Sequence, residues 1–216
     1  HTVRPLSISY NHLVRRTAAF DEALEANPGL GLSFRNQFIP QASYLFGFET
    51  RDPLSRHTFS LEAYVSEAGN LLSLCYAKDT PRPYRLAGSS FAQFVKGTAE
   101  LRYTYGIDRN QSLALRAGVG AIYSYGNMTV APYSEQFYVG GANSIRAFTV
   151  RSIGPGRFVP RNSRYAFMDQ TGEFKLEMNA EYRFRLAGDL HGALFLDSGN
   201  IWLLRPDENR PGASLQ

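Results

Sequence analysis

The stretch FKLEMNAEYRFR, from Phe174 to Arg185, decides the fold. Apolar side chains occupy every second position: Phe174, Leu176, Met178, Ala180, Tyr182 and Phe184. The positions between them hold polar side chains: Lys175, Glu177, Asn179, Glu181, Arg183 and Arg185. A strand places each of these sets on one face, whereas a helix would scatter both around its axis. The stretch therefore predicts a long β-strand with one apolar face and one charged face.

The same alternation recurs along the chain and predicts about seven strands in an all-β fold. It is clear from Val95 to Tyr105 and from Ser112 to Ser124, and weaker from Val3 to Leu13, Gln37 to Thr50, Thr58 to Ser66 and Leu190 to Trp202. Several of these strands exceed the usual five or six residues. Strands that tilt across a bilayer need about this greater length.

The connections between the strands are short and long in turn. Short turns are expected at Arg51–Pro53, Gly106–Asn110 and Leu186–Asp189, and long excursions over 14–36, 70–90 and 126–171. Outer-membrane barrels have this pattern, with the short turns on the periplasmic side. The first excursion is expected to carry a short helix, with Asp21 and Glu22 in its first turn and a stop at Asn27-Pro28-Gly29.

Two environments could explain the two-faced strands. In a soluble sandwich the apolar face would be the core, whereas in a membrane barrel it would face lipid and the charged face would line a wet lumen. Three features favour the barrel: charges of both signs on the polar faces, Tyr and Phe near strand ends, and small residues such as Gly97, Ala99 and Ala180 on the apolar faces. No run approaches the roughly 20 apolar residues of a transmembrane helix.

Composition argues against several other classes of protein. The net charge of +4 is spread over the 216 residues without a basic block, so we expect no nucleic-acid partner. The single cysteine, Cys75, cannot form an internal disulfide. The four histidines (His1, His12, His57 and His191) are scattered, so we expect no metal site and no cofactor. No nucleophile elbow is present, and we expect no catalytic residues and no enzyme.

The longest excursion contains the stretch FYVGGANSIRAF, Phe137 to Phe148, followed by Ile153-Gly154-Pro155. Gly140 and Gly141 permit a turn with positive φ, and Ser144 can bond to nearby backbone. Arg146 stands between Ile145 and Phe148, which could act as apolar anchors and bury its stem. A guanidinium held there would need carboxylate partners. In an arbitrary loop, an exposed arginine is the alternative interpretation.

This stretch resembles the signature loop of the BamA/TamA outer-membrane assembly-factor superfamily, the bacterial surface antigen type. The family loop has Gly-Gly, a short spacer, Val-Arg-Gly-Phe or Val-Arg-Gly-Tyr, and then Gly-Pro. The stretch FLDSGNIW from Phe195 to Trp202, with Gly199 inside it, is similar to the family's Phe-x-Asp-x-Gly-x-x-Trp strand. NAEYRF, 179–184, is similar to the strand between these motifs.

The resemblance covers about Tyr133 to Trp202, and upstream it rests on strand pattern and loop style. The segment NQFIP, 36–40, is similar to the TamA-like lipoproteins of Bacteroidetes. One position departs from the family pattern, because Ala147 stands where the family has glycine. If that position needs positive φ, alanine is strained there.

The resemblance implies that residues 1–216 are a partial transmembrane barrel domain. They would form the C-terminal-side portion of a sixteen-stranded antiparallel β-barrel, with further strands expected before His1 and after Gln216. The long loop 126–171 would fold back into the lumen, where Arg146 would bond to Glu181 and Asp197. Both acids have the parity of the charged faces of their strands, so both can point inward.

The implied function is assembly, insertion or translocation of other outer-membrane or surface proteins, without a chemical step. The implied location is the bacterial outer membrane, and the implied partners are its lipid, client proteins, and periplasmic or inner-membrane accessory proteins. Two alternatives stay open: an exporter of the two-partner secretion type from the same superfamily, and a passive porin or adhesin barrel. The passive barrel would give no reason for an Arg146–Asp197 pair.

Overall fold

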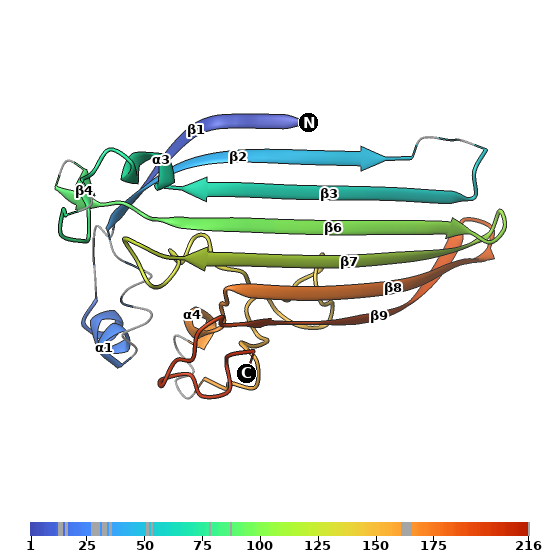
Figure 1. Ribbon diagram of the computed structural model, residues 1–216. Coiled ribbons are helices and arrows are strands. Elements are labelled where there is room, and N and C mark those ends of the chain that lie inside the picture. The colour runs from blue at the N-terminus through green and yellow to red at the C-terminus, as the bar shows by residue number, and fades with distance from the viewer. Residues whose placement is uncertain are drawn as a thin grey trace.

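The computed structural model describes residues 1–12, 15, 17–26, 31, 34, 36–50, 52, 54–77, 79–86, 88–160 and 166–215. Within these residues, seven strands form one antiparallel sheet in the order β1-β2-β3-β6-β7-β8-β9 (Figure 1). These strands are β1 (Thr2–Asn11), β2 (Gln37–Glu49), β3 (His57–Ala68), β6 (Phe94–Gly106), β7 (Gln111–Ser124), β8 (Phe174–Ala187) and β9 (Leu190–Trp202). The predictions of an all-β fold and of about seven strands are confirmed, although Leu13, the predicted end of the first strand, lies outside the described residues.

Each strand of the sheet pairs with its neighbour along the chain, so the order is that of a meander. On β6 and β7, Ala99 lies opposite Val119 and Arg102 lies opposite Arg116. On β8 and β9, Asn179 lies opposite Asp197. This register keeps apolar side chains beside apolar ones and polar beside polar, because partners in a ladder point to the same face.

The short and long connections lie at opposite ends of the sheet, as the sequence predicted. Figure 1 shows the β2–β3, β6–β7 and β8–β9 turns at the right and the long excursions at the left. The first excursion carries α1 (Ala18–Ala26), which confirms the predicted helix, while its predicted stop at 27–29 lies outside the described residues. The shorter elements α3 (Asn70–Ser73), β4 (Arg85–Leu86), β5 (Ser89–Ser90) and α4 (Ala166–Asp169) were not predicted.

The apolar face of the sheet is exposed in this chain. Met178 is 52% exposed and Leu196 is 74% exposed. The buried apolar cluster lies on the opposite face, where Phe94, Ile122 and Ile201 pack against loop residues such as Val139. In a soluble sandwich the apolar face would instead be the core. The arrangement therefore fits a sheet whose apolar face meets lipid.

Aromatic side chains gather near both ends of the strands. At the short-turn end, the ring of His57 stacks on that of Tyr105 at 4.8 Å, and Tyr182 stacks on Phe184 at 5.5 Å. At the loop end, Tyr123 stacks on Tyr125 at 6.0 Å. Such rings suit the two interfaces between lipid and water. No helix within the described ranges has the length and apolar character that a bilayer span requires.

A charged side chain introduced on the apolar face of the sheet should destabilise the protein more than one introduced on the charged face. Ala99 and Thr98 are neighbours in the middle of β6, at the same depth but on opposite faces. We expect Ala99→Arg to lower the free energy of unfolding of the full-length protein in lipid vesicles by about 2–4 kcal/mol, because arginine at the bilayer midplane is costly. The matched variant Thr98→Arg should cost much less. Equal losses in urea unfolding would contradict the assignment of the faces.

Candidate functional site

The long loop lies against the charged face of the sheet. Its backbone pairs at Phe137 with Gly172, just before β8, through two hydrogen bonds of 2.9 Å. The Phe137 ring lies over β7 at Gly120, where an added Cβ would come within 2.7 Å of the ring. Lys96 on β6 binds Glu135 at 3.0 Å. Gly120 and the Lys96–Glu135 ion pair therefore hold the first part of the loop against the sheet.

The tip of the loop is a tight turn that the glycine pair makes possible. Gly140 has φ 101° and Gly141 has φ 97°, a region that favours glycine. An added Cβ on Gly140 would lie 2.2 Å from the carbonyl oxygen of Thr149. The Gly140 N–H donates to Ser144 Oγ at 3.0 Å, and the Ser144 N–H donates to the Gly141 carbonyl at 3.0 Å. The geometry matches the backbone bonding that the sequence predicted for Ser144.

Arg146 reaches the strand wall with its whole guanidinium group. Nε donates to Asp197 Oδ2 at 2.8 Å, and Nη2 donates to Asp197 Oδ1 at 2.8 Å, which makes the pair bidentate. Nη1 forms an ion pair with Glu181, and the backbone N–H of Arg146 donates to Asp197 Oδ2 at 2.9 Å. The structure thus brings together the three residues that the resemblance paired.

The surroundings of this pair hold its charges in place. The Asp197 side chain is only 4% exposed, and Asn179 Nδ2 also donates to its Oδ1 at 2.8 Å. The guanidinium lies 3.9 Å from the centre of the Phe195 ring, a cation–π contact. Hydrogen bonds to Asp197 and Glu181 raise the pKa of Arg146 above its usual value, so the side chain stays cationic.

The two predicted apolar anchors of Arg146 differ in burial. Ile145 is 4% exposed and belongs to the buried cluster. Phe148 is 52% exposed, and its contact with the Arg146 stem stays a prediction. Ala147 has φ 70° and turns the chain between the two side chains. Phe195, on β9, provides an aromatic contact to the guanidinium.

The remaining motif residues lie where the loop returns along β9. Gly154 has φ 76°, and an added Cβ would lie 2.4 Å from Asn200 Oδ1. Pro155 is fully buried. On β9, a Cβ on Gly199 would lie 2.6 Å from the Leu176 carbonyl oxygen, and the Trp202 ring lies 5.8 Å from that of Phe174. These positions serve close packing, and none of them touches the Arg146 guanidinium in the described contacts.

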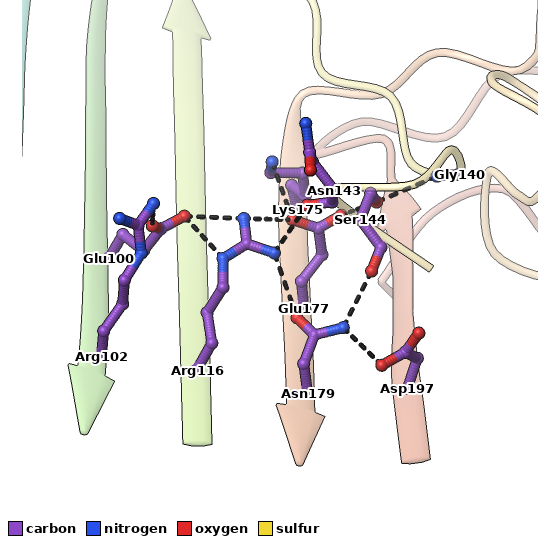
Figure 2. Close-up of polar contacts among 10 residues, drawn as sticks. All are labelled: Glu100, Arg102, Arg116, Gly140, Asn143, Ser144, Lys175, Glu177, Asn179 and Asp197. Carbon is purple, nitrogen blue, oxygen red and sulfur yellow. Dashed lines mark hydrogen bonds and ion pairs between the residues drawn. The ribbon is translucent and has the colours of Figure 1, made fainter. Parts of the chain in front are cut away.

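The sequence interpretation missed a second set of polar residues beside Arg146 and its two acids. Glu177 is 1% exposed and accepts a hydrogen bond from Ser144 Oγ, while Arg116 binds Glu100 and Glu177 (Figure 2). Glu177 shares the parity of Asn179 and Glu181, and this pattern in the sequence placed it on the charged face. In the part of the chain that the structure describes, no group of three His, Cys, Asp or Glu side chains could hold a metal ion.

Comparisons with known proteins agree with this fold. A model of the Omp85 superfamily domain matches residues 76–214. The chain is 26% identical over 122 residues to the outer membrane protein assembly factor BamA of Neisseria meningitidis serogroup B, a match that covers 54% of this chain and 15% of that protein. The solved structure of BamA from Haemophilus ducreyi lacking POTRA domains 1–3 matches with a TM-score of 0.56 at 14% identity, over 89% of this chain and 36% of that one. The chain therefore spans well under half of either relative.

Ala147 yields a test of the loop geometry. Its φ of 70° is costly for alanine and ordinary for glycine. We expect Ala147→Gly to raise the free energy of unfolding by about 0.5–1 kcal/mol, since the relief of strain exceeds the added freedom of the unfolded chain. Ala142→Gly, in the same loop without a positive φ, should be neutral or destabilising. Urea titration in lipid vesicles measures both, and a loss of stability in Ala147→Gly would contradict the strained turn.

Proposed function

The chain belongs to the Omp85 superfamily, and from this membership we propose that it forms part of an outer-membrane β-barrel that assembles, inserts or translocates other outer-membrane or surface proteins. The supporting observation is a loop fixed by Arg146 to Asp197 and Glu181 on the charged face of a sheet whose other face is apolar and exposed. A wet lumen inside and lipid outside would satisfy both faces.

The proposed barrel has sixteen strands and acts without a chemical step. Its substrate would be an unfolded client strand, and its working element an exposed strand edge, which offers a row of unpaired backbone donors and acceptors. In lipid a strand must satisfy its backbone as it enters, so a templating edge lowers the barrier to insertion. The partners would be outer-membrane lipid, client proteins, and periplasmic or inner-membrane accessory proteins.

Within this function Arg146 acts as a structural clamp. It would pin the loop inside the lumen and stiffen β8 and β9, which carry its two acids. A bidentate arginine–carboxylate pair suits this role, because it fixes orientation as well as distance. A passive porin would not need such a pair, so the clamp supports the assembly function over that alternative.

Removing either partner of the clamp should weaken the barrel. We expect Arg146→Ala and Asp197→Ala each to lower the free energy of unfolding by about 2–3 kcal/mol, because a carboxylate or guanidinium is left without its charged partner. Both should also lower the yield of assembled protein and of inserted client. Heat-modifiability on gels and insertion of a client barrel measure the two effects.

A double variant and a surface arginine serve as controls. Arg146→Ala with Asp197→Ala should lose less stability than the sum of the single losses, because neither charge is left alone. Arg109→Ala, at an exposed residue in the β6–β7 turn, should behave like the unmodified protein. Normal heat-modifiability together with normal client insertion in both single variants would refute the clamp.

A further inference from the structure

A small cavity lies among the long excursions, at the end of the sheet that Figure 1 shows on the left. Its volume is about 280 Å³. The first residue of β2, the end of the second excursion and the start of the long loop meet there, and the lining consists of Gln37, Arg82, Pro83, Ser90, Phe91 and residues 126–130. None of these residues is an aspartate or a glutamate, so an anion in the cavity would meet no like charge in its lining.

The side chain of Asn127 joins the walls of this cavity. Its Nδ2 donates to the carbonyl oxygens of Tyr84 at 2.9 Å and Phe91 at 3.0 Å. Its Oδ1 accepts the Tyr84 N–H at 2.7 Å, and its own backbone N–H donates to Gln93 Oε1 at 3.1 Å. Both donors of the Asn127 amide are therefore used within the chain, and the cavity is formed before any ligand enters.

Gln37 brings a hydrogen-bond donor that is not used. Its side chain is 3% exposed, and its Nε2 has no hydrogen-bond partner among the residues that the structure describes. Nearly all buried polar groups in folded proteins are paired, because an unpaired one has lost its water without a replacement. An unpaired amide in the wall of a cavity therefore points to a ligand that accepts a hydrogen bond.

Arg82 adds a positive charge to the same cavity. The centre of its guanidinium lies 5.3 Å from that of the Tyr84 ring, which is buried, and this cation–π contact orients the group. Gly126 leaves space for it, since an added Cβ there would lie 3.0 Å from Arg82 Nη1. Within the described part of the chain, no carboxylate forms an ion pair with Arg82. Its charge is thus available to an anionic ligand.

We propose that this cavity binds a phosphate group, with Gln37 Nε2 and the Arg82 guanidinium as its donors. A phosphate monoester carries about 1.5–2 negative charges and three strong acceptor oxygens, so it can satisfy both donors at once. Arginine suits this ligand, because its planar fork of N–H groups matches phosphate oxygens. The cavity is smaller than the roughly 300–1,000 Å³ of typical ligand pockets, which favours a small group over a whole nucleotide.

The source of the phosphate rests on the proposed function, in which the long excursions lie on the outer side of the membrane. There the group could belong to the headgroup of a lipid or to a soluble molecule. Both sources present the same chemistry to Gln37 and Arg82. A lipid headgroup in the cavity would tie the second excursion and the start of the long loop to the membrane surface.

Calorimetric titration of the full-length protein in detergent micelles with inorganic phosphate tests the site. Gln37→Leu and Arg82→Gln should each weaken phosphate binding about tenfold or more, the effect of losing one hydrogen bond to a charged group. Arg85→Gln is the matched control, because Arg85 is exposed, lies three residues from Arg82 and does not line the cavity. Acetate, with two oxygens and one charge, should bind at least about tenfold more weakly than phosphate. Equal binding of phosphate by all three variants and the unmodified protein would overturn the site, and so would equal binding of acetate.

Urea unfolding separates a binding role of Gln37 from a structural one. Without phosphate, Gln37→Leu should have an unfolding midpoint at least as high as the unmodified protein, because it removes a buried amide that has no partner. Phosphate should raise the midpoint of the unmodified protein and of Arg85→Gln, but not that of Gln37→Leu. A lower midpoint for Gln37→Leu without phosphate would assign the amide a structural role and overturn its place in the site. If Gln37→Leu fails to fold, Arg82→Gln, changed at an exposed residue, decides alone.

Vesicles distinguish the two sources of the ligand. If phosphatidic acid in phosphatidylcholine vesicles raises the unfolding midpoint, and Arg82→Gln abolishes the rise, the ligand is a lipid headgroup. If only inorganic phosphate raises it, the ligand is soluble; both results support the site, and no rise with either probe overturns it. Neither assay needs a client protein. Phosphate binding without client insertion would refute the assembly function alone, whereas insertion without phosphate binding would refute the site alone.

Discussion

The sheet has one apolar face and one charged face, which need different surroundings. The rest of the structure depends on this difference. Leu194 and Leu196 are 66% and 74% exposed, and apolar area left in water costs about 25 cal/mol per Å². The other face carries Glu100, Arg116 and Glu177, which could not face lipid without a large desolvation cost. A wall with lipid outside and water inside satisfies both, and it leaves only the inner side for a loop with many polar backbone groups.

On that inner side, the loop and the wall complete each other's hydrogen bonds. Two wall carboxylates, on Asp197 and Glu177, are 4% and 1% exposed, and a carboxylate so buried is stable only with several donors. The loop supplies part of each set, through Arg146 to Asp197 and through Ser144 to Glu177. The wall supplies the rest, from Asn179, Arg116 and Lys175. The bound loop therefore also stabilises the buried carboxylates of Asp197 and Glu177 on the strands.

The strands and their two faces were predictable from the sequence, because a period of two is local and repeats for ten or more residues. Parity also placed Glu177, Glu181 and Asp197 on the inner face. Parity does not say how far along the wall a loop residue reaches, so the contact between Ser144 and Glu177 could not be derived. The pairing of Arg146 with two acids came from family resemblance, and its role stays a prediction. Elements such as β4 and β5, two residues each, are too short for any period to appear.

The strained turn at Ala147 is held by contacts on both sides of it. Alanine at φ 70° has a conformational cost that persists only where the surroundings hold it on both sides. On one side Ser144 and Arg146 bind the wall, and on the other the Phe148 carbonyl accepts the Gly141 N–H at 2.9 Å, which closes the turn. The charged side chains that bind this turn come from β7, β8 and β9. The turn therefore ties together three adjacent strands, and under the proposed function the barrel would open elsewhere in its wall.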